Sequence, residues 1–216
     1  MKIDERLLSL EEKVFLQLEE EILSEKLTRG TSLGEIALSE RLGVSRTPIR
    51  SALHRLAEEG LIETITNRGA VVVGINRDDL IDIYRIRVRL EGLASATAAE
   101  RISEEGLREI TESVELAEFY INKKDTERLK ELDSAFHETI YRESGNRLLF
   151  KTLTELHRKI KTYRKLSLTV PGRLERSVYE HKEILAAIAK GDAQEADRLT
   201  SLHIERALEN TLKAFE

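Results

Sequence analysis

The chain has no cysteine and no tryptophan, and its 216 residues include only two prolines. Without cysteine there is no disulfide, no thiolate metal ligand and no cysteine nucleophile. The scarcity of proline argues against a loop-rich or β-sandwich fold and favours long helices. No apolar run approaches the roughly 18 residues of a membrane span, and the first residues are too highly charged for a signal peptide. We therefore expect a soluble, cytoplasmic protein without a membrane partner.

Acidic residues outnumber basic ones, and the formal net charge of −5 disfavours nucleic-acid binding when it is taken alone. The charge is unevenly distributed along the chain. Residues 41–57 contain four arginines and one histidine but no acidic residue, whereas glutamates flank this segment on both sides. The net charge of the whole chain therefore conceals one locally positive segment.

Residues 1–75 show the element order of a winged helix-turn-helix domain. A capping box at Ser9 predicts a first helix, residues 35–42 predict a short second helix, and Ser45 begins a third helix that stops at Gly60. The β-branched runs LIETI and AVVVGI then predict the two strands of a hairpin.

Residues 76–216 show apolar residues at three- and four-residue spacing and no strand-like alternation. We expect six helices, near residues 78–101, 104–122, 126–144, 146–168, 172–190 and 193–213. The predicted fold is mainly α: an N-terminal winged helix-turn-helix domain followed by an all-α antiparallel bundle of about six helices.

The acid-free segment supplies the residues expected to contact DNA. Arg46 and Arg50 are four residues apart near the start of the third helix, with Thr47 between them. Arginine can pair with guanine through two hydrogen bonds, while hydroxyl groups and a helix N-terminus bind phosphate oxygens. Arg68 at the hairpin tip is expected in the minor groove or on the backbone. Arg41 and Ser45 complete the set from this segment. The alternative is an ordinary solvated helix face, which the helix–turn–helix–ribbon context makes less favourable.

The segment LGVSRTPIRSALHRLAEEGLIETITNRGAVVVG resembles the N-terminal domain of the GntR superfamily of bacterial transcription regulators. The resemblance implies a dimeric regulator of a palindromic operator, with Arg46, Thr47 and Arg50 as operator contacts and Gly69 as the wing-tip glycine. The chain departs from the family pattern at three places. Ile36 replaces a common arginine, Arg29-Gly30 replaces Pro-Gly, and Ser51 replaces an acidic residue, so operator preference is less predictable.

A second group of residues suits metal chemistry. Asp133 and His137 are four residues apart and project from one helical face, while His181 and His203 lie on two other predicted helices. Bundle metal sites are built from inward-facing side chains of several helices. Three imidazoles and one carboxylate suit Zn²⁺, Ni²⁺, Co²⁺ or Mn²⁺. The alternatives are hydrogen-bonded structural histidines and a simple Asp–His pair within one helix.

Residues 78–213 resemble the all-helical FCD effector domain of the FadR-type branch of that superfamily. The matching segments are RVRLE, DSAFH, ESGN, EHK and GDA followed by His203. The resemblance implies that Asp133, His137, His181 and His203 bind a divalent metal, for which we expect zinc, and that this is the metal-binding rather than the acyl-CoA-binding subtype.

A carboxylate effector is expected at open positions of that metal. Arg87 is the candidate partner of its carboxylate, with a salt bridge to Glu91 as an equal alternative. Asn146 is a second candidate contact, although a helix cap explains it better.

The predicted domains are therefore a DNA-binding domain at residues 1–75 and an FCD effector-binding and dimerisation domain at residues 76–216. We expect a homodimeric transcriptional repressor whose binding to a double-stranded DNA operator is controlled by a small carboxylate. One alternative is a metal-dependent hydrolase, for which no general base beyond the ligands and no nucleophile motif is evident. The other is a regulator with a purely structural metal.

Overall fold

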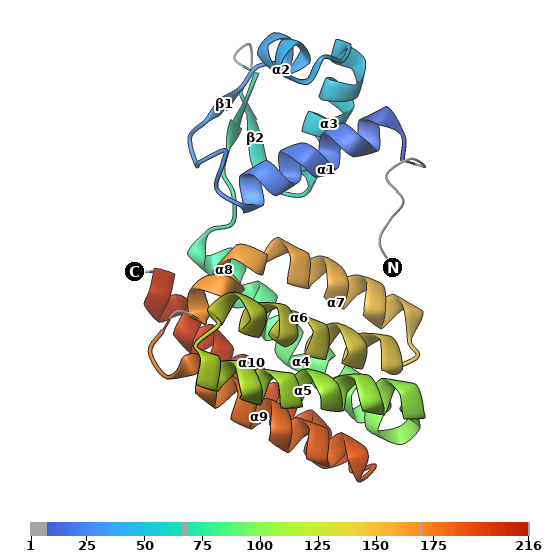
Figure 1. Ribbon diagram of the computed structural model, residues 1–216. Coiled ribbons are helices and arrows are strands. Elements are labelled where there is room, and N and C mark those ends of the chain that lie inside the picture. Colours follow the sequence, from blue (N-terminus) through green and yellow to red (C-terminus); the bar gives the residue numbers. More distant parts are fainter. Residues whose placement is uncertain (1–7, 66–68, 169, 216) are drawn as a thin grey trace. The chain divides into compact units, whose positions relative to one another are not determined.

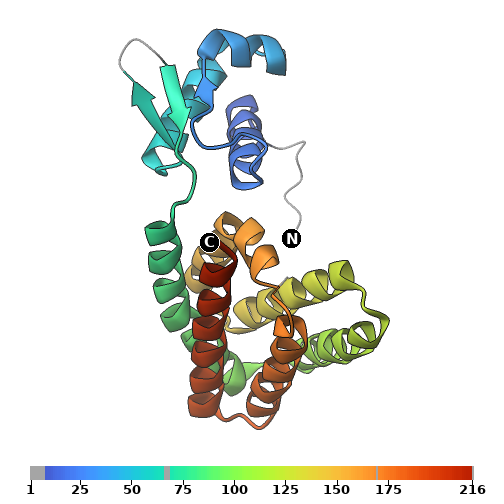
Figure 2. The same cartoon turned by 90° about the vertical axis from the view of Figure 1, so that its left-hand side faces the viewer.

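The computed structural model describes residues 8–65, 69–168 and 170–215 (Figures 1 and 2). Backbone contacts divide the chain into two units, Met1–Asn76 and Arg77–Glu216. Each unit has its own cluster of buried hydrophobic side chains, so each is described by itself.

The first unit combines three helices with a small antiparallel sheet. Its elements are α1 (Leu10–Leu23), β1 (Ser32–Leu33), α2 (Glu35–Leu42), α3 (Arg46–Glu58), β2 (Ile62–Ile65) and β3 (Gly69–Val72). The sheet order is β1-β3-β2, with Ile62 opposite Val72 and Ser32 opposite Val71. The predicted winged helix-turn-helix is confirmed. Strand β1 was not predicted because two residues are too few to show alternation.

Local signals set the boundaries of these helices. The Glu12 N–H donates to Ser9 Oγ at 3.1 Å and begins α1. Gly43 ends α2 in the left-handed conformation at φ 65°, which glycine adopts without a Cβ penalty. Pro48 lies in the first turn of α3, where the missing N–H has no intrahelical partner to lose. The buried faces of α1 and α3 then pack together around Leu18 and Leu56.

The second unit consists of helices throughout its described residues. They are α4 (Arg77–Arg101), α5 (Glu104–Lys123), α6 (Thr126–Glu143), α7 (Arg147–Lys159), α8 (Lys161–Ser167), α9 (Arg173–Ala189) and α10 (Ala193–Phe215). The mainly α fold is confirmed. The single helix expected at 146–168 is wrong, because the chain leaves helical geometry at Ile160 (φ −103°, ψ 12°). The break allows α8 to pack on α10, and no glycine or proline marks it in the sequence.

Helices α4 and α10 run antiparallel along a shared, largely buried interface. Tyr84 Oη and Thr211 Oγ1 lie 2.9 Å apart, and Thr200 donates to Ser95 at 2.8 Å further along the pair. Gly92 permits the close approach, since a Cβ there would overlap the side chain of Asp197. Within the described part of the chain, no helix is both long and apolar enough to cross a membrane.

The core of the helical unit yields a direct test of this packing. Ile110 of α5 is fully buried, whereas Leu116 on the same helix is 46% exposed. We expect Ile110→Ala to lower the free energy of unfolding by about 2–5 kcal/mol, because it removes buried methyl groups and leaves a cavity. Leu116→Ala should change it by no more than about 0.5 kcal/mol. Urea unfolding followed by circular dichroism measures both, and equal losses would contradict the assigned helix face.

Candidate functional site

The exposed edge of α2 and α3 carries most of the residues predicted to contact DNA. Ser45, Arg46, Thr47 and Arg50 are exposed around the first two turns of α3, and Arg41 is exposed near the end of α2. The Ser45 side chain occupies the N-cap position without making a capping hydrogen bond. The first N–H groups of α3 and the positive end of its dipole therefore remain available to an anion.

Arg46 and Arg50 share one carboxylate. Arg46 Nη2 donates to Glu35 Oε2 at 3.0 Å, and Arg50 donates to Glu35 from Nε and Nη2 at 3.0 and 2.9 Å. Hydrogen bonds from Arg50 and then Arg46 lower the pKa of Glu35 to about 2. Two guanidinium groups against one carboxylate leave this exposed patch positive, and Glu35 holds the two arginines side by side.

The other residues predicted to contact DNA, Arg41, Arg68 and Gly69, differ from one another in their surroundings. Arg41 Nη2 pairs with Glu21 at 2.7 Å. Arg68 lies outside the described residues. Gly69 has φ 85°, and a Cβ there would lie 3.0 Å from the carbonyl oxygen of Leu33. This close approach of β1 gives a structural reason for glycine at that position, and its role at DNA stays a prediction.

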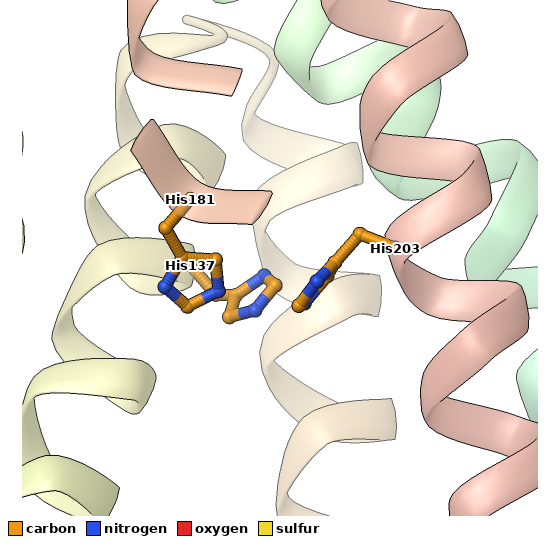
Figure 3. Close-up of side chains that lie close together, drawn as sticks. All are labelled: His137, His181 and His203. Atoms are coloured by element: carbon orange, nitrogen blue, oxygen red, sulfur yellow. The ribbon is translucent and has the colours of Figure 1, made fainter. Parts of the chain in front are cut away.

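The structure brings three of the four predicted metal ligands together. His137 of α6, His181 of α9 and His203 of α10 are buried, and one ring nitrogen of each lies within 4.8 Å of the others (Figure 3). The Nε2 atoms of His137 and His181 are buried and make no hydrogen bond. A buried nitrogen without a partner is costly, and a bound cation would satisfy it.

Carboxylates lie behind two of these rings. His137 Nδ1 is 2.9 Å from Glu91 Oε2, and His203 Nδ1 is 2.7 Å from Glu180 Oε2. The hydrogen bond between Glu180 and His203 Nδ1 fixes the tautomer of that ring and leaves its Nε2 as the electron-pair donor toward a metal, whereas Glu91 Oε2 lies close to His137 without a hydrogen bond. The outer partners are therefore arranged as they are around metal-binding histidines.

Burial favours the neutral form of His181 and His203. It lowers the pKa of His203 to about 4, with neighbouring His137 adding to the effect and Glu180 opposing it. Burial also holds the pKa of His181 well below its ordinary value, and the nearby His203 acts in the same direction. Neutral imidazole is the form that binds metal ions, so the cluster is poised for a cation near neutral pH.

Asp133, the fourth predicted ligand, lies beside the cluster rather than within it. Its Oδ1 is 3.7 Å from His181 Nε2 and accepts from Ser177 at 3.4 Å, while its Oδ2 accepts from Arg164 Nη2 at 2.6 Å. Burial raises its pKa, but Arg164 and the neighbouring imidazoles outweigh burial and hold that pKa well below the ordinary range. Arg164 Nη1 also lies 2.6 Å from His157 Nδ1.

The two residues predicted to contact the effector, Arg87 and Asn146, lie in different surroundings. Arg87 is 1% exposed and pairs with Glu91, with 2.6 Å between Nη2 and Oε1, so the expected salt bridge is formed. Its Nη1 is buried without a hydrogen-bond partner. Asn146 is exposed and caps α7, accepting from the N–H groups of Leu148 and Leu149 at 3.1 Å. It does not line the cavity beside the histidines.

Sequence reasoning missed several charged residues around the histidines. A small cavity of about 20 Å³ is lined by Arg87, Asp133, His137, Arg164, Arg173, Ser177 and His203 together with apolar and hydroxyl groups. Glu180 precedes His181 in the chain, so its position offered a signal. Arg164 carried none, because it lies on α8, whereas Arg173 lies at the start of α9, the helix that also carries Glu180 and His181.

Comparison with known proteins identifies both units. The model "Bacterial regulatory proteins, gntR family" matches residues 10–72, and the FCD domain model matches residues 82–206, more than half of the chain. The chain therefore belongs to the GntR family of transcriptional regulators with an FCD domain. It is a DNA-binding regulator and not an enzyme, which removes the hydrolase alternative.

Individual relatives agree with this family. The HTH-type transcriptional repressor RspR of Escherichia coli is 26% identical, over 92% of this chain and 87% of its own. The gluconate operon transcriptional repressor of Bacillus licheniformis is 28% identical, over 80% of this chain and 70% of the repressor's length. Among solved structures, E. coli McbR/YncC shares the fold with a TM-score of 0.74 at 24% identity, over 97% of this chain and all of its own. A metal-free FCD domain of TM0439 matches 66% of this chain and 97% of its own, with a TM-score of 0.54 and 23% identity.

The Arg164–Asp133 pair generates a stability test. Arg164→Met leaves Asp133 buried without its cation, so we expect the metal-free chain to lose about 3–5 kcal/mol of unfolding free energy. Adding Asp133→Asn should recover part of that loss, since the uncompensated charge is then removed. Arg198→Met is the control, because that arginine is 60% exposed and its pair with Glu195 is screened by water. Urea denaturation in the presence of a chelator measures all four chains, and a loss no larger than that of the control would show the pair to be unimportant.

Proposed function

We propose that this regulator represses transcription from a palindromic operator as a homodimer, and that a small carboxylate bound at a metal site in the helical unit controls operator binding. The observation that carries the control element is the cluster of three buried imidazoles, His137, His181 and His203. The Nε2 atoms of His137 and His181 have no hydrogen-bond partner, and carboxylates lie behind the rings of His137 and His203.

The DNA half of the proposal rests on the α3 edge. Arg46, Thr47 and Arg50 lie at the exposed start of a helix that follows a tight glycine turn, where recognition helices present side chains to bases. The Arg–Glu35 pairs at this edge are exposed and therefore contribute little to stability. DNA phosphates or guanine can replace Glu35 there at small cost.

The metal half rests on donor chemistry. Three imidazoles and the carboxylate of Asp133 suit Zn²⁺, with Ni²⁺, Co²⁺ and Mn²⁺ as alternatives, and thiolate-preferring ions are disfavoured. When bound, the ion would supply a Lewis-acidic centre able to hold a carboxylate oxygen. The residues that would hold it are His137, His181 and His203, with Asp133 beside them.

Control requires that the effector interact differently with two states of the dimer. The two half-sites of a palindrome demand a fixed separation of the recognition helices, so a change in that separation releases the operator. A purely structural metal is the second candidate, and the near-complete burial of the three histidines favours it. In that case metal removal lowers thermal stability without altering the response to any ligand.

For the DNA-reading edge, we expect Arg50→Ala to weaken operator binding by about 1–3 kcal/mol, because a forked contact to a base or phosphate is lost. Arg198→Ala is the matched control: it is an exposed arginine of the helical unit, and operator affinity should stay unchanged. Fluorescence anisotropy with operator DNA selected from random sequence measures both. If Arg50→Ala bound the operator with the affinity of the unaltered chain, the assignment of α3 as the recognition helix would be wrong.

For the metal site, we expect Zn²⁺ at about 100 times its Kd to stabilise the full chain by about 2.7 kcal/mol. His181→Ala should abolish this gain, because it removes one ligand, whereas exposed His54→Ala should retain it. Thermal unfolding with and without Zn²⁺, and equilibrium dialysis for stoichiometry, measure the effect. Undiminished Zn²⁺ binding by His181→Ala would place the metal elsewhere.

A further inference from the structure

Arg164 is a buried arginine of α8 whose guanidinium group is held by side chains of two other helices. Its Nη2 donates to Asp133 Oδ2 of α6 at 2.6 Å, and its Nη1 lies 2.6 Å from His157 Nδ1 of α7. The residue is 8% exposed. A buried guanidinium requires an anion beside it. His157 offers a hydrogen-bond acceptor but no negative charge, so Asp133 is the residue that neutralises Arg164.

The carboxylate of Asp133 lies between this arginine and the histidine cluster. Its Oδ2 accepts from Arg164, whereas its Oδ1 is 3.7 Å from His181 Nε2, a buried nitrogen without a hydrogen-bond partner among the described residues. Burial raises the pKa of Asp133, and Arg164 is the largest of the influences that nevertheless hold it below its ordinary range. One negative charge therefore faces a guanidinium on one side and a group of metal-binding nitrogens on the other.

Two cations at one buried carboxylate repel each other. The repulsion is strong because water screens charges little at such a site, and one carboxylate cannot neutralise a guanidinium and a divalent ion together. Resting on the metal site proposed above, we propose that Arg164 is an internal substitute for the metal, so that this arginine and a metal ion compete for Asp133. The arginine then sets how tightly the site binds metal.

An orienting role for Arg164 is the opposite reading. Ligating carboxylates commonly accept hydrogen bonds from outer partners, and the loss of such a partner lowers metal affinity by about 10–100-fold. Competition is favoured because Asp133 is the only residue that forms a salt bridge with Arg164 within the described chain. The pair is a full charge pair and not a hydrogen bond from a neutral group. The two roles predict changes of opposite sign when Arg164 is removed.

Helix α8 is the element that the exchange of partners affects. It is seven residues long, and a helix of that length depends on tertiary contacts for its stability. It follows the break at Ile160, and Arg164 joins it to α6. When Asp133 turns to a metal, the guanidinium loses its counter-charge and is driven toward water. The competition therefore couples metal binding to loosening of α8.

The first test measures the Zn²⁺ affinity of the full-length chain at neutral pH by competition with a chelating dye. We expect Arg164→Met to bind Zn²⁺ about tenfold or more tightly, because Asp133 is then left without its internal cation. Arg206→Met is the matched control. Arg206 contacts Glu180 at 3.0 Å rather than Asp133, and its removal should change the affinity less than about threefold.

A double-variant cycle shows whether the effect acts through the carboxylate. In a chain that already carries Asp133→Asn, we expect Arg164→Met to change Zn²⁺ affinity less than about threefold, because the competing pair no longer exists. A gain as large as in the unaltered chain would mean that Arg164 acts on the metal directly, and the competition for Asp133 would be wrong.

Hydrogen exchange followed by mass spectrometry tests the movement in the unaltered chain. We expect saturating Zn²⁺ to speed exchange of the backbone amides of residues 161–167 about fivefold or more, because α8 loses its buried ion pair. Amides around the buried Ile110 of α5 should exchange no faster. Unchanged or slower exchange in α8 would overturn the release of this helix.

The outcomes distinguish this inference from the proposed function. Zn²⁺ binding that is weaker in Arg164→Met overturns the competition and assigns Arg164 the orienting role. Unchanged affinity, or an equal gain in Arg206→Met, also overturns it. Failure of the unaltered chain and Arg164→Met alike to bind Zn²⁺ overturns the proposed metal site itself, together with the inference. If Arg164→Met does not fold, hydrogen exchange of the unaltered chain decides the matter.

Discussion

Neutralisation of buried charge is the constraint on which the helical unit depends. Arg87, Arg164 and Arg173 are each largely removed from water, and each requires a carboxylate within hydrogen-bonding distance. Only the Arg164–Asp133 pair joins two helices, and the carboxylates of all three pairs lie next to the histidines. Glu91 contacts His137, Glu180 contacts His203 and Asp133 contacts Arg164, and these contacts join α4 to α6, α9 to α10 and α6 to α8. The packing of these helices and the geometry of the cluster are therefore one arrangement.

The DNA-binding unit uses the same residue types under opposite conditions. Arg46 and Arg50 are exposed and share the half-buried Glu35, so water screens the attraction and the pairs contribute little to stability. Exposed pairs exchange partners readily, and this suits a surface proposed to bind phosphates reversibly. It also explains how a chain of net charge −5 can bind DNA, because the local excess of guanidinium matters more than the total.

Periodic and local features made most of the fold predictable. The caps at Ser103, Asp125 and Asn146 and the three- and four-residue spacing of apolar side chains placed the helices of the bundle. The break at Ile160 left no trace, because it results from packing of α8 on α10. The histidines were found because each occupies the buried face of its own helix. The role of Arg164 was not, since its partners come from α6 and α7 and only the folded chain brings them together.

The proposed regulation gives α4 a particular importance. This helix begins at Arg77, where the second unit starts, and it carries both Arg87 and Glu91 of the histidine surroundings. A ligand that engages the spare donor of Arg87 acts on a side chain fixed in a continuous helix of 25 residues. Because packed helices shift as rigid elements rather than bending freely, a change at residue 87 is felt along the whole helix. The segment that follows the DNA-binding unit in the chain is thus itself a wall of the proposed effector site.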